Sequence, residues 1–343
     1  MDMKDWPEGT PSELMEMWHD SRQRAAKAKK IEGWKDEIAD RIHELLGFVE
    51  ERPVSLPVAF DTGLAALNAL LGSGLPVGVT EVFGASSTGK SSLAYQLIGA
   101  AQVAGLRAVL CATQRPPADL MKRLGVNTKE LCLLRARHLE DAVVAILDGF
   151  VAKEGRLFLV VDTATGLRPE VDGPGMWTHI MEGFLAGLAN DLSPCSAALI
   201  VNEVRARRSV DPAKMFAGGT DSAARRAARM IPTRLELHRD SVTEEEYSLV
   251  VRAVASQNRP PQQYVTMPAR KGRGVDAVRT LVETGVKTGV VASRGMWLYF
   301  DHVKLGAGAR NAADELRKDE MESTLEQLYV KVQSRISGVE ELL

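Results

Sequence analysis

The segment GASSTGKS, from Gly84 to Ser91, has the residue types and spacing of a loop that binds phosphate. Gly84 and Gly89 let backbone amides turn toward phosphate oxygens without a Cβ in the way. Lys90 is spaced to reach the β- and γ-phosphates of a nucleotide, and the Ser91 hydroxyl to bind Mg²⁺. The residues predicted to bind the cofactor are Gly84, Ser86, Ser87, Thr88, Gly89, Lys90, Ser91 and Ser92.

The sequence around this phosphate loop supports the same chemistry. The apolar run VTEVF precedes it and the helical stretch KSSLAYQLIGAAQVAG follows, so a helix N-terminus adds partial positive charge to the loop. A later apolar run, RLFLVVD, ends in Asp162, whose carboxylate can hold a Mg²⁺-bound water. A chance glycine-rich turn and an Asp capping a strand end are the alternatives. The ordered context favours ATP and Mg²⁺ as cofactors, with Ser91 and Asp162 on the metal.

Short apolar runs that alternate with helical stretches must position these residues. The runs VTEVFG, RAVLCAT, RLFLVVDT and AALIVNEV are typical of strands buried on both faces. Their alternation with helices predicts an α/β fold, a mostly parallel twisted sheet wrapped by helices. TRLELHRD and YSLVVRAVAS predict further, antiparallel strands, whereas QNRPPQQYVTMPARKGRG, rich in Pro, Gly and Gln, predicts a loop-rich edge.

The 343 residues are expected to form three parts: a helical oligomerisation region over 1–50, a nucleotide-binding core over 51–273 and a small α/β domain over 274–343. The net charge of −2 excludes a global attraction to nucleic acid, so any such binding needs a local basic patch. The dispersed Cys111, Cys132 and Cys195 form neither a metal-binding pattern nor a disulfide framework. With no apolar run of about 18 residues, we expect a cytoplasmic protein with no membrane partner.

A basic segment follows the run AALIVNEV. It reads RARRSVDPAKMFAGGTDSAARRAAR, in which glycines would let a nucleic-acid strand approach and Met215 and Phe216 could stack on bases. A solvated basic loop joined to an Arg-rich helix is the alternative. The predicted DNA-binding residues are Arg205, Arg207, Arg208, Lys214, Met215, Phe216, Gly218, Gly219, Arg225 and Arg226.

The chain resembles the bacterial and phage RecA recombinase family from roughly Ser55 to Gln333. The resemblance rests on ordered motifs: DTGLAALNALLGSGLPVGVTEVFGASSTGKSSL, LVVDTATGLRP, LIVNEVRARR, KMFAGG and LVETGVKTGVVASRGMWLYFDHVKLGAGARNAADEL. It implies a RecA-like P-loop core and a head-to-tail helical filament with ATP between subunits. It also implies single-stranded and duplex DNA as partners, and roles in recombination, repair and the SOS response to DNA damage.

The resemblance also locates departures at the reaction centre. The family's water-activating Glu falls at Thr113, next to Gln114, and neither residue is a carboxylate. The γ-phosphate sensor of the family, an Asn followed by Gln, is here Asn202 and Glu203. Glu203 is a candidate displaced base, and Gln114 could orient water but not take its proton. Catalytic candidates are therefore Lys90, Glu203 and Gln114.

Two further departures concern the cationic residues that an adjacent subunit would contribute and the residues that would contact the adenine. The family's two lysines that reach the adjacent subunit's ATP fall at Ala255 and Gln257, with Arg252 and Arg259 close enough in sequence to substitute. The adenine-contacting acid and aromatic fall near Pro117 and Leu120, which leaves adenine selectivity open.

These observations predict a RecA-like protein that binds ATP, forms filaments on single-stranded DNA and acts in recombination and repair, with slow or absent hydrolysis. Whether it is an enzyme stays open at this point. The alternative is a degenerate paralogue that regulates a RecA filament or resembles ImuA, the accessory of damage-induced repair polymerases. In that case RecA or a repair polymerase would be its partner.

Overall fold

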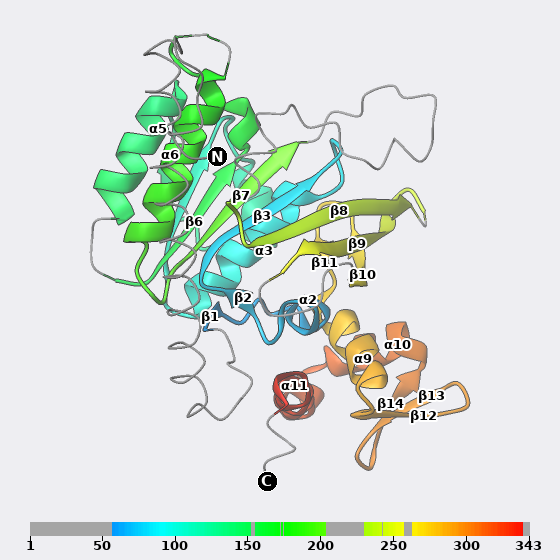
Figure 1. The fold of residues 1–343 in the computed structure, drawn as a ribbon. Coiled ribbons are helices and arrows are strands. Elements are labelled where there is room, and N and C mark those ends of the chain that lie inside the picture. The colour runs from blue at the N-terminus through cyan, green and yellow to red at the C-terminus, as the bar shows by residue number, and fades with distance from the viewer. Residues whose placement is uncertain are drawn as a thin grey trace, which may run out of the picture. The chain divides into compact units, whose positions relative to one another are not determined.

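The computed structural model describes residues 57–151, 155–171, 173, 175–203, 230–241, 243–256 and 263–338 (Figure 1). The predicted helical region over 1–50 lies outside these residues. All described residues belong to one compact unit, Leu56–Leu343.

A nine-stranded sheet forms the centre of this unit (Figure 1). In spatial order its strands are β11 (Gly274–Val275), β10 (Tyr264–Arg270), β9 (Glu246–Ala255), β8 (Thr233–Ser241), β3 (Gly78–Gly84), β7 (Ala197–Glu203), β6 (Leu157–Asp162), β4 (Arg107–Ala112) and β5 (Cys132–Leu134). The strands from β8 to β5 pair in parallel, while β9, β10 and β11 pair antiparallel. The predicted α/β class and mostly parallel sheet are confirmed.

Helices cover both faces of this sheet, as its apolar runs require. One face packs on α3 (Lys90–Val103) and α4 (Ala118–Arg123), and its core includes Val82, Leu110 and Val160. The other face packs on α5 (Leu139–Ile146), the π-helical turn Leu147–Val151 and α6 (Met176–Asp191). Successive residues of these strands therefore point into the two cores on opposite faces of the sheet. Because both faces are covered, these strands do not alternate polar and apolar residues as a half-exposed sheet would.

The predicted loop-rich edge is wrong over Tyr264–Arg270, which forms β10 in continuous antiparallel register with β9. Pro and Gln residues suggested a loop, yet Met267 and Ala269 alternate with exposed or half-exposed neighbours and are buried. Pro268 is tolerated within the strand, opposite Ser248. Burial of alternate side chains has outweighed a residue with low strand propensity.

The C-terminal part has a core of its own. It contains α9 (Ala277–Lys287), the antiparallel sheet β12 (Val291–Arg294), β13 (Trp297–Phe300) and β14 (Val303–Ala307), then α10 (Gly308–Leu316), the 3-10 turn Asp319–Met321 and α11 (Glu322–Ser337). Leu281, Phe300 and Leu328 are buried in this core.

Helix α2 (Ala65–Leu71) joins the two cores, and it follows β1 (Val58–Phe60), which pairs with β2 (Leu75–Pro76). Ala65 is fully buried in the C-terminal core, whereas Leu67 and Leu70 belong to the core under the large sheet. The Tyr329 hydroxyl of α11 donates to Asp61, 2.6 Å away, just before α2. Burial and this hydrogen bond raise the pKa of Tyr329.

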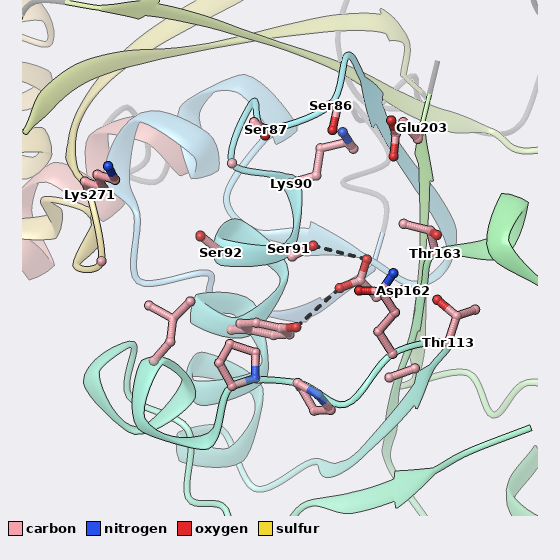
Figure 2. A pocket seen from close by; sticks show the side chains of 18 of the residues that line it. Ser86, Ser87, Lys90, Ser91, Ser92, Thr113, Asp162, Thr163, Glu203 and Lys271 are labelled. Atoms are coloured by element: carbon pink, nitrogen blue, oxygen red, sulfur yellow. Dashed lines mark hydrogen bonds between the residues drawn. The ribbon is translucent and has the colours of Figure 1, made fainter. Parts of the chain in front are cut away.

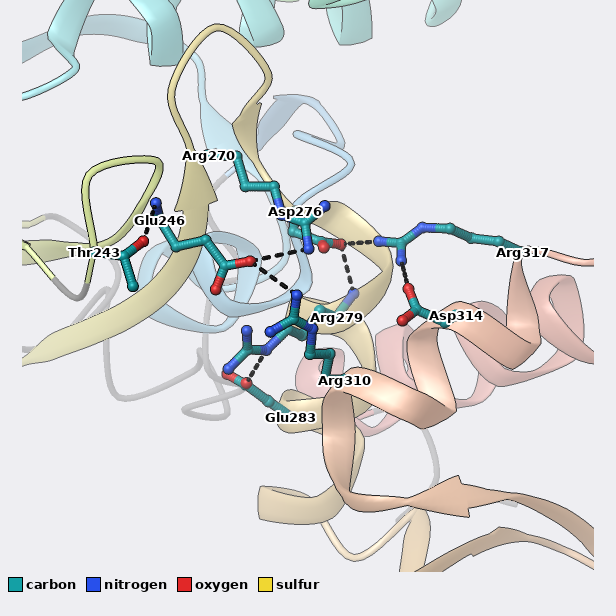
Figure 3. A network of polar contacts seen from close by, with 9 residues as sticks. All are labelled: Thr243, Glu246, Arg270, Asp276, Arg279, Glu283, Arg310, Asp314 and Arg317. Carbon is teal, nitrogen blue, oxygen red and sulfur yellow. Dashed lines mark hydrogen bonds and ion pairs between the residues drawn. The ribbon is translucent and has the colours of Figure 1, made fainter.

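A polar network also connects the large sheet to the C-terminal helices (Figure 3). Glu246 of β9 accepts from Arg270 of β10 at 3.0 Å and from Arg310 of α10 at 3.2 Å. Asp276 caps α9 by accepting the Arg279 N–H at 3.0 Å and also pairs with Arg317. Within the described residues, no helix is long and apolar enough to span a bilayer.

Candidate nucleotide site

The phosphate loop leaves the carboxyl end of β3, between β7 and β8 in the middle of the sheet. The chain turns sharply there, with a positive φ of 62° at Ser87 and 99° at Gly89. A Cβ on Gly84 would lie 2.4 Å from the Leu237 carbonyl oxygen of β8. Glycine is therefore required at Gly84 for close strand packing, and it is favoured at Gly89 by the backbone conformation.

Lys90, the first residue of α3, lies beneath this loop and is only 6% exposed. Its Nζ donates to the Gly84 carbonyl at 3.1 Å and to the Ala85 carbonyl at 2.5 Å. Burial lowers the pKa of Lys90, while the Glu203 and Asp162 carboxylates act in the opposite direction. The Lys90 ammonium thus donates hydrogen bonds to two neutral carbonyl oxygens. A negatively charged phosphate oxygen would be a stronger acceptor than either of them.

Asp162 is the last residue of β6, and its carboxylate accepts hydrogen bonds from two hydroxyl groups of α3 (Figure 2). Ser91 Oγ donates at 3.2 Å to one carboxylate oxygen, and the Tyr95 hydroxyl donates at 3.4 Å to the other. Burial raises the pKa of Asp162, and the hydrogen bonds and Lys90 oppose that effect. The structure brings together the two side chains predicted to hold the metal.

A cavity of about 540 Å³ opens over these groups. The predicted nucleotide-binding residues that line it are Ser86, Ser87, Gly89, Lys90, Ser91 and Ser92. Thr88 lies outside the lining and is buried, where its hydroxyl donates to the Ala85 carbonyl at 3.0 Å and braces the loop.

The charge of the lining favours an anionic ligand. Among the described residues it contains four cations, Lys90, Arg115, Arg239 and Lys271, and two carboxylates, Asp162 and Glu203. Figure 2 shows Lys271 and Glu203 on opposite sides of Lys90. The net positive charge suits a polyphosphate.

Thr113, Gln114 and Glu203, which depart from the family pattern, also line this cavity. Thr113 and Gln114 follow β4, and the Thr113 N–H donates to the Asp162 carbonyl at 3.0 Å. Glu203, at the end of β7, lies on the same side of the view as Thr113 and Asp162 (Figure 2). Pro117 and Leu120 form an apolar part of the wall. Asp162 and Glu203 are thus the described carboxylates near the place where water would be activated.

Asn202, the other predicted sensor, is not among the residues that line the cavity. Its amide donates to Glu81 Oε1 at 2.6 Å, and Arg234 of β8 donates to the other oxygen of the same carboxylate at 2.5 Å. Glu81 is 4% exposed, so this carboxylate is buried between two donors. Asn202 acts here as a structural link between β7 and β3.

The predicted DNA-binding residues lie outside the described residues, as do Gln257 and Arg259. Arg252, the other candidate substitute for the family's lysines, is paired with Glu236. Trp177 of α6 packs against the core on that face of the sheet, and its indole N–H donates to the Leu167 carbonyl at 3.1 Å.

Comparison with known proteins agrees with this geometry. The family model described as the RecA N-terminal domain matches residues 46–207. Protein RecA of Brucella canis is 30% identical over 289 residues, 78% of this chain and 79% of the relative. The chain belongs to the RecA family. Protein RecA of Allorhizobium ampelinum is 29% identical over 289 residues, 78% of each chain, and Protein RecA of Brucella suis biovar 1 is 30% identical.

In this RecA-family chain, the residues present fit Mg²⁺ and a nucleoside triphosphate. Ser91 and Asp162 form the oxygen donor set that Mg²⁺ prefers, and they already face each other at 3.2 Å. Lys90 and the positive-φ loop fit the phosphates. The bound cofactor would supply an electrophilic phosphorus and the metal's positive charge.

The sequence did not identify several lining residues of this RecA-family site, among them Tyr95, Arg239, Tyr247 and Lys271. Tyr95 lies one helical turn after Ser91, a spacing that could have identified it. Arg239, Tyr247 and Lys271 come from β8, from β9 and from the residue after β10. No local motif marks them, because only the pairing of these strands brings them to the cavity.

Proposed function

We propose that this RecA-family chain binds ATP with Mg²⁺, assembles as a filament on single-stranded DNA and acts in homologous recombination and DNA repair, hydrolysing ATP slowly. One observation carries the proposal. Lys90, Ser91 and Asp162, which we expect to bind the nucleotide and metal, lie together in the cavity, while Thr113 and Gln114 supply no carboxylate where the family's water-activating Glu would fall.

The binding step follows from the groups described above. Lys90 exchanges two backbone carbonyls for phosphate oxygens, and the loop amides contribute their donors. Ser91 would hold Mg²⁺ through its hydroxyl, and Asp162 through a metal-bound water. These contacts serve ground-state binding, so they are sufficient for a nucleotide-dependent conformational state.

The hydrolysis step is expected to be slow for a separate reason. General-base catalysis contributes about 10²- to 10⁴-fold to a rate, and Gln114 can orient water but cannot accept its proton. Glu203 is the remaining described candidate, on the other side of Lys90 from Lys271 (Figure 2). A carboxylate there also repels the γ-phosphate. We propose that ATP acts mainly as a ligand that holds subunits together.

The DNA-binding part of the proposal rests on the basic segment after β7. Its arginines would neutralise backbone phosphates and release counterions. We expect Arg207→Ala with Arg208→Ala to weaken single-stranded DNA binding and to reduce the salt slope by roughly 1 to 2 units. Fluorescence anisotropy across a salt series measures both. Unchanged affinity at moderate salt would count against the assignment.

The whole proposal is tested by four measurements on the full chain. We expect a non-hydrolysable ATP analogue with Mg²⁺ to bind, and phosphate release with single-stranded DNA to be far below that of Brucella RecA measured in parallel. We also expect filaments and strand exchange with ATP or the analogue. Lys90→Ala is the control that should lose all four properties.

Two outcomes would change the conclusion. Phosphate release equal to that of the Brucella protein would overturn slow hydrolysis. Nucleotide binding without filaments or strand exchange would replace the recombinase by the accessory paralogue, whose expected property is association with a RecA filament or a repair polymerase.

A further inference from the structure

Arg239, near the end of β8, lies on the wall of the nucleotide cavity. Its guanidinium carbon lies 4.2 Å from the centre of the Tyr247 ring on β9. Arg239 pairs with Leu249 in the strand register, so Tyr247 is its diagonal neighbour on the same face of the sheet. Stacking on an aromatic ring fixes the plane of the guanidinium and leaves its edge available to acceptors.

Tyr247 is itself anchored against the phosphate loop. It is 6% exposed, and its hydroxyl lies 3.4 Å from the position that a Cβ of Gly89 would occupy. Burial raises the pKa of Tyr247, with Arg239 opposing the effect. The buried, neutral Tyr247 ring thus lies against both the Arg239 guanidinium and the phosphate loop at Gly89.

Arg239 differs from three other arginines in the antiparallel part of the sheet because it has no acidic partner among the described residues. Arg234 pairs with Glu81, Arg252 with Glu236, and Arg270 with Glu246. Arg239 has no ion pair with any residue that the structure describes, and its Nε is buried without a hydrogen-bond partner there. A partly buried cation without an anion is unfavourable unless a ligand supplies the charge.

We propose that Arg239, stacked on Tyr247, binds the phosphates of the nucleotide from within the same subunit. The inference rests on the proposed function only in taking this cavity as the nucleotide site. In this arrangement, Lys90 from beneath the phosphate loop and Arg239 from β8 would both bind the polyphosphate of one nucleotide within one subunit. Nucleotide binding then does not need the neighbour's cations, whose expected positions hold Ala255 and Gln257.

The test compares equilibrium binding of a fluorescent, non-hydrolysable ATP analogue with Mg²⁺, without DNA, at a protein concentration where sedimentation shows single subunits. Arg239→Gln is expected to weaken binding about tenfold or more, the range for a charge-assisted hydrogen bond. Arg294→Gln is the matched control, since Arg294 also stacks on a tyrosine, Tyr299, at 5.2 Å, but outside the cavity.

The melting temperature separates ligand binding from a structural role. Without nucleotide, Arg239→Gln should melt at the same temperature or higher, because it removes an unpaired charge. With nucleotide, its increase in melting temperature should be smaller than that of the unchanged chain. A lower melting temperature with unchanged affinity would overturn the inference and make Arg239 a structural residue.

Two further comparisons complete the test. If Arg239→Gln does not fold, Arg239→Lys decides: at least about threefold weaker binding supports the role of the planar guanidinium, and unchanged binding overturns it. If Arg239→Gln binds normally while Lys90→Ala does not, this inference fails and the proposed function stands. If Lys90→Ala also binds normally, the cavity is not the nucleotide site and the proposed function fails.

Discussion

At the scale of single residues, the side chains predicted to bind the nucleotide and those predicted to activate water line the same cavity. Lys90, Ser91 and Asp162 come from one motif and one strand end, and they contact each other or the loop directly. Glu203 also lines the cavity, at the position where the resemblance implies a neutral amide. Binding and hydrolysis can therefore be separated by substitution in this chain.

Glu203→Gln tests that separation. Replacing the carboxylate by the family's amide removes a negative charge beside the γ-phosphate, so the affinity for the Mg²⁺–ATP analogue should rise about two- to fivefold. If Glu203 is the displaced base, phosphate release should fall about tenfold or more. A coupled phosphate assay and analogue titration give the two values.

The control for this prediction is Glu130→Gln, an exposed carboxylate outside the cavity, which should change neither quantity. Faster phosphate release by Glu203→Gln would show that the carboxylate hinders the reaction and that another group activates water.

How much of the site the sequence predicted depends on how local its signals are. Lys90, Ser91 and Asp162 were predictable, because loop glycines and an acid at a strand end are local patterns. Tyr247 and Arg239 were not, because their meeting depends on the register of β8 against β9 and on the approach of β9 to Gly89. The DNA-binding assignment at Arg207 and Arg208 stays a prediction.

At the scale of elements, the strands most of whose residues are buried were predictable from the sequence. The strand β10 was not, because its residues are alternately buried and half-buried and its segment contains Pro and Gln. The runs that became β3, β4, β6 and β7 are apolar throughout, since both faces are covered. In β10, only alternate residues such as Met267 and Ala269 are fully buried. Composition therefore suggested a loop, and the pairing with β9 decided the strand.

The N-terminus of α9 supplies a prediction at this scale (Figure 3). Asp276→Ala removes both the helix cap at the Arg279 N–H and the partner of Arg317, so the free energy of unfolding should fall by about 1–2 kcal/mol. Urea unfolding followed by circular dichroism measures it.

Asp314→Ala is the matched control, since Asp314 pairs with the same Arg317 but caps no helix. Its side chain is 58% exposed, against 15% for Asp276. We expect a loss below about 0.5 kcal/mol. Equal losses in the two variants would mean that the Arg317 ion pairs, and not the cap, stabilise this end of α9.

At the scale of the whole molecule, α2 makes the described part of the chain one mechanical unit. Ala65 belongs to the C-terminal core while Leu67 and Leu70 belong to the sheet core. The network at Glu246 adds a second connection between β9 and α10. Opening one core therefore exposes apolar surface of the other.

Ligand-dependent hydrogen exchange tests this coupling. A nucleotide at about 100 times its dissociation constant stabilises the folded state by about 2.7 kcal/mol. If the cores open together, the slowest amides of β13 should exchange about a hundredfold more slowly with nucleotide, although β13 does not line the cavity. Lys90→Ala should show no change. Slowing confined to β3, α3 and β6 would show that the C-terminal part opens by itself.

The carboxylate of Glu81 has a practical consequence. It binds Asn202 just before residues 204–229 and Arg234 shortly after them, so one buried side chain fastens both attachment points of that segment. Because both attachment points are held by this carboxylate, we expect residues 204–229 to be replaceable without loss of the nucleotide site. A chimera carrying the corresponding stretch of Brucella RecA should therefore keep the nucleotide affinity of this chain.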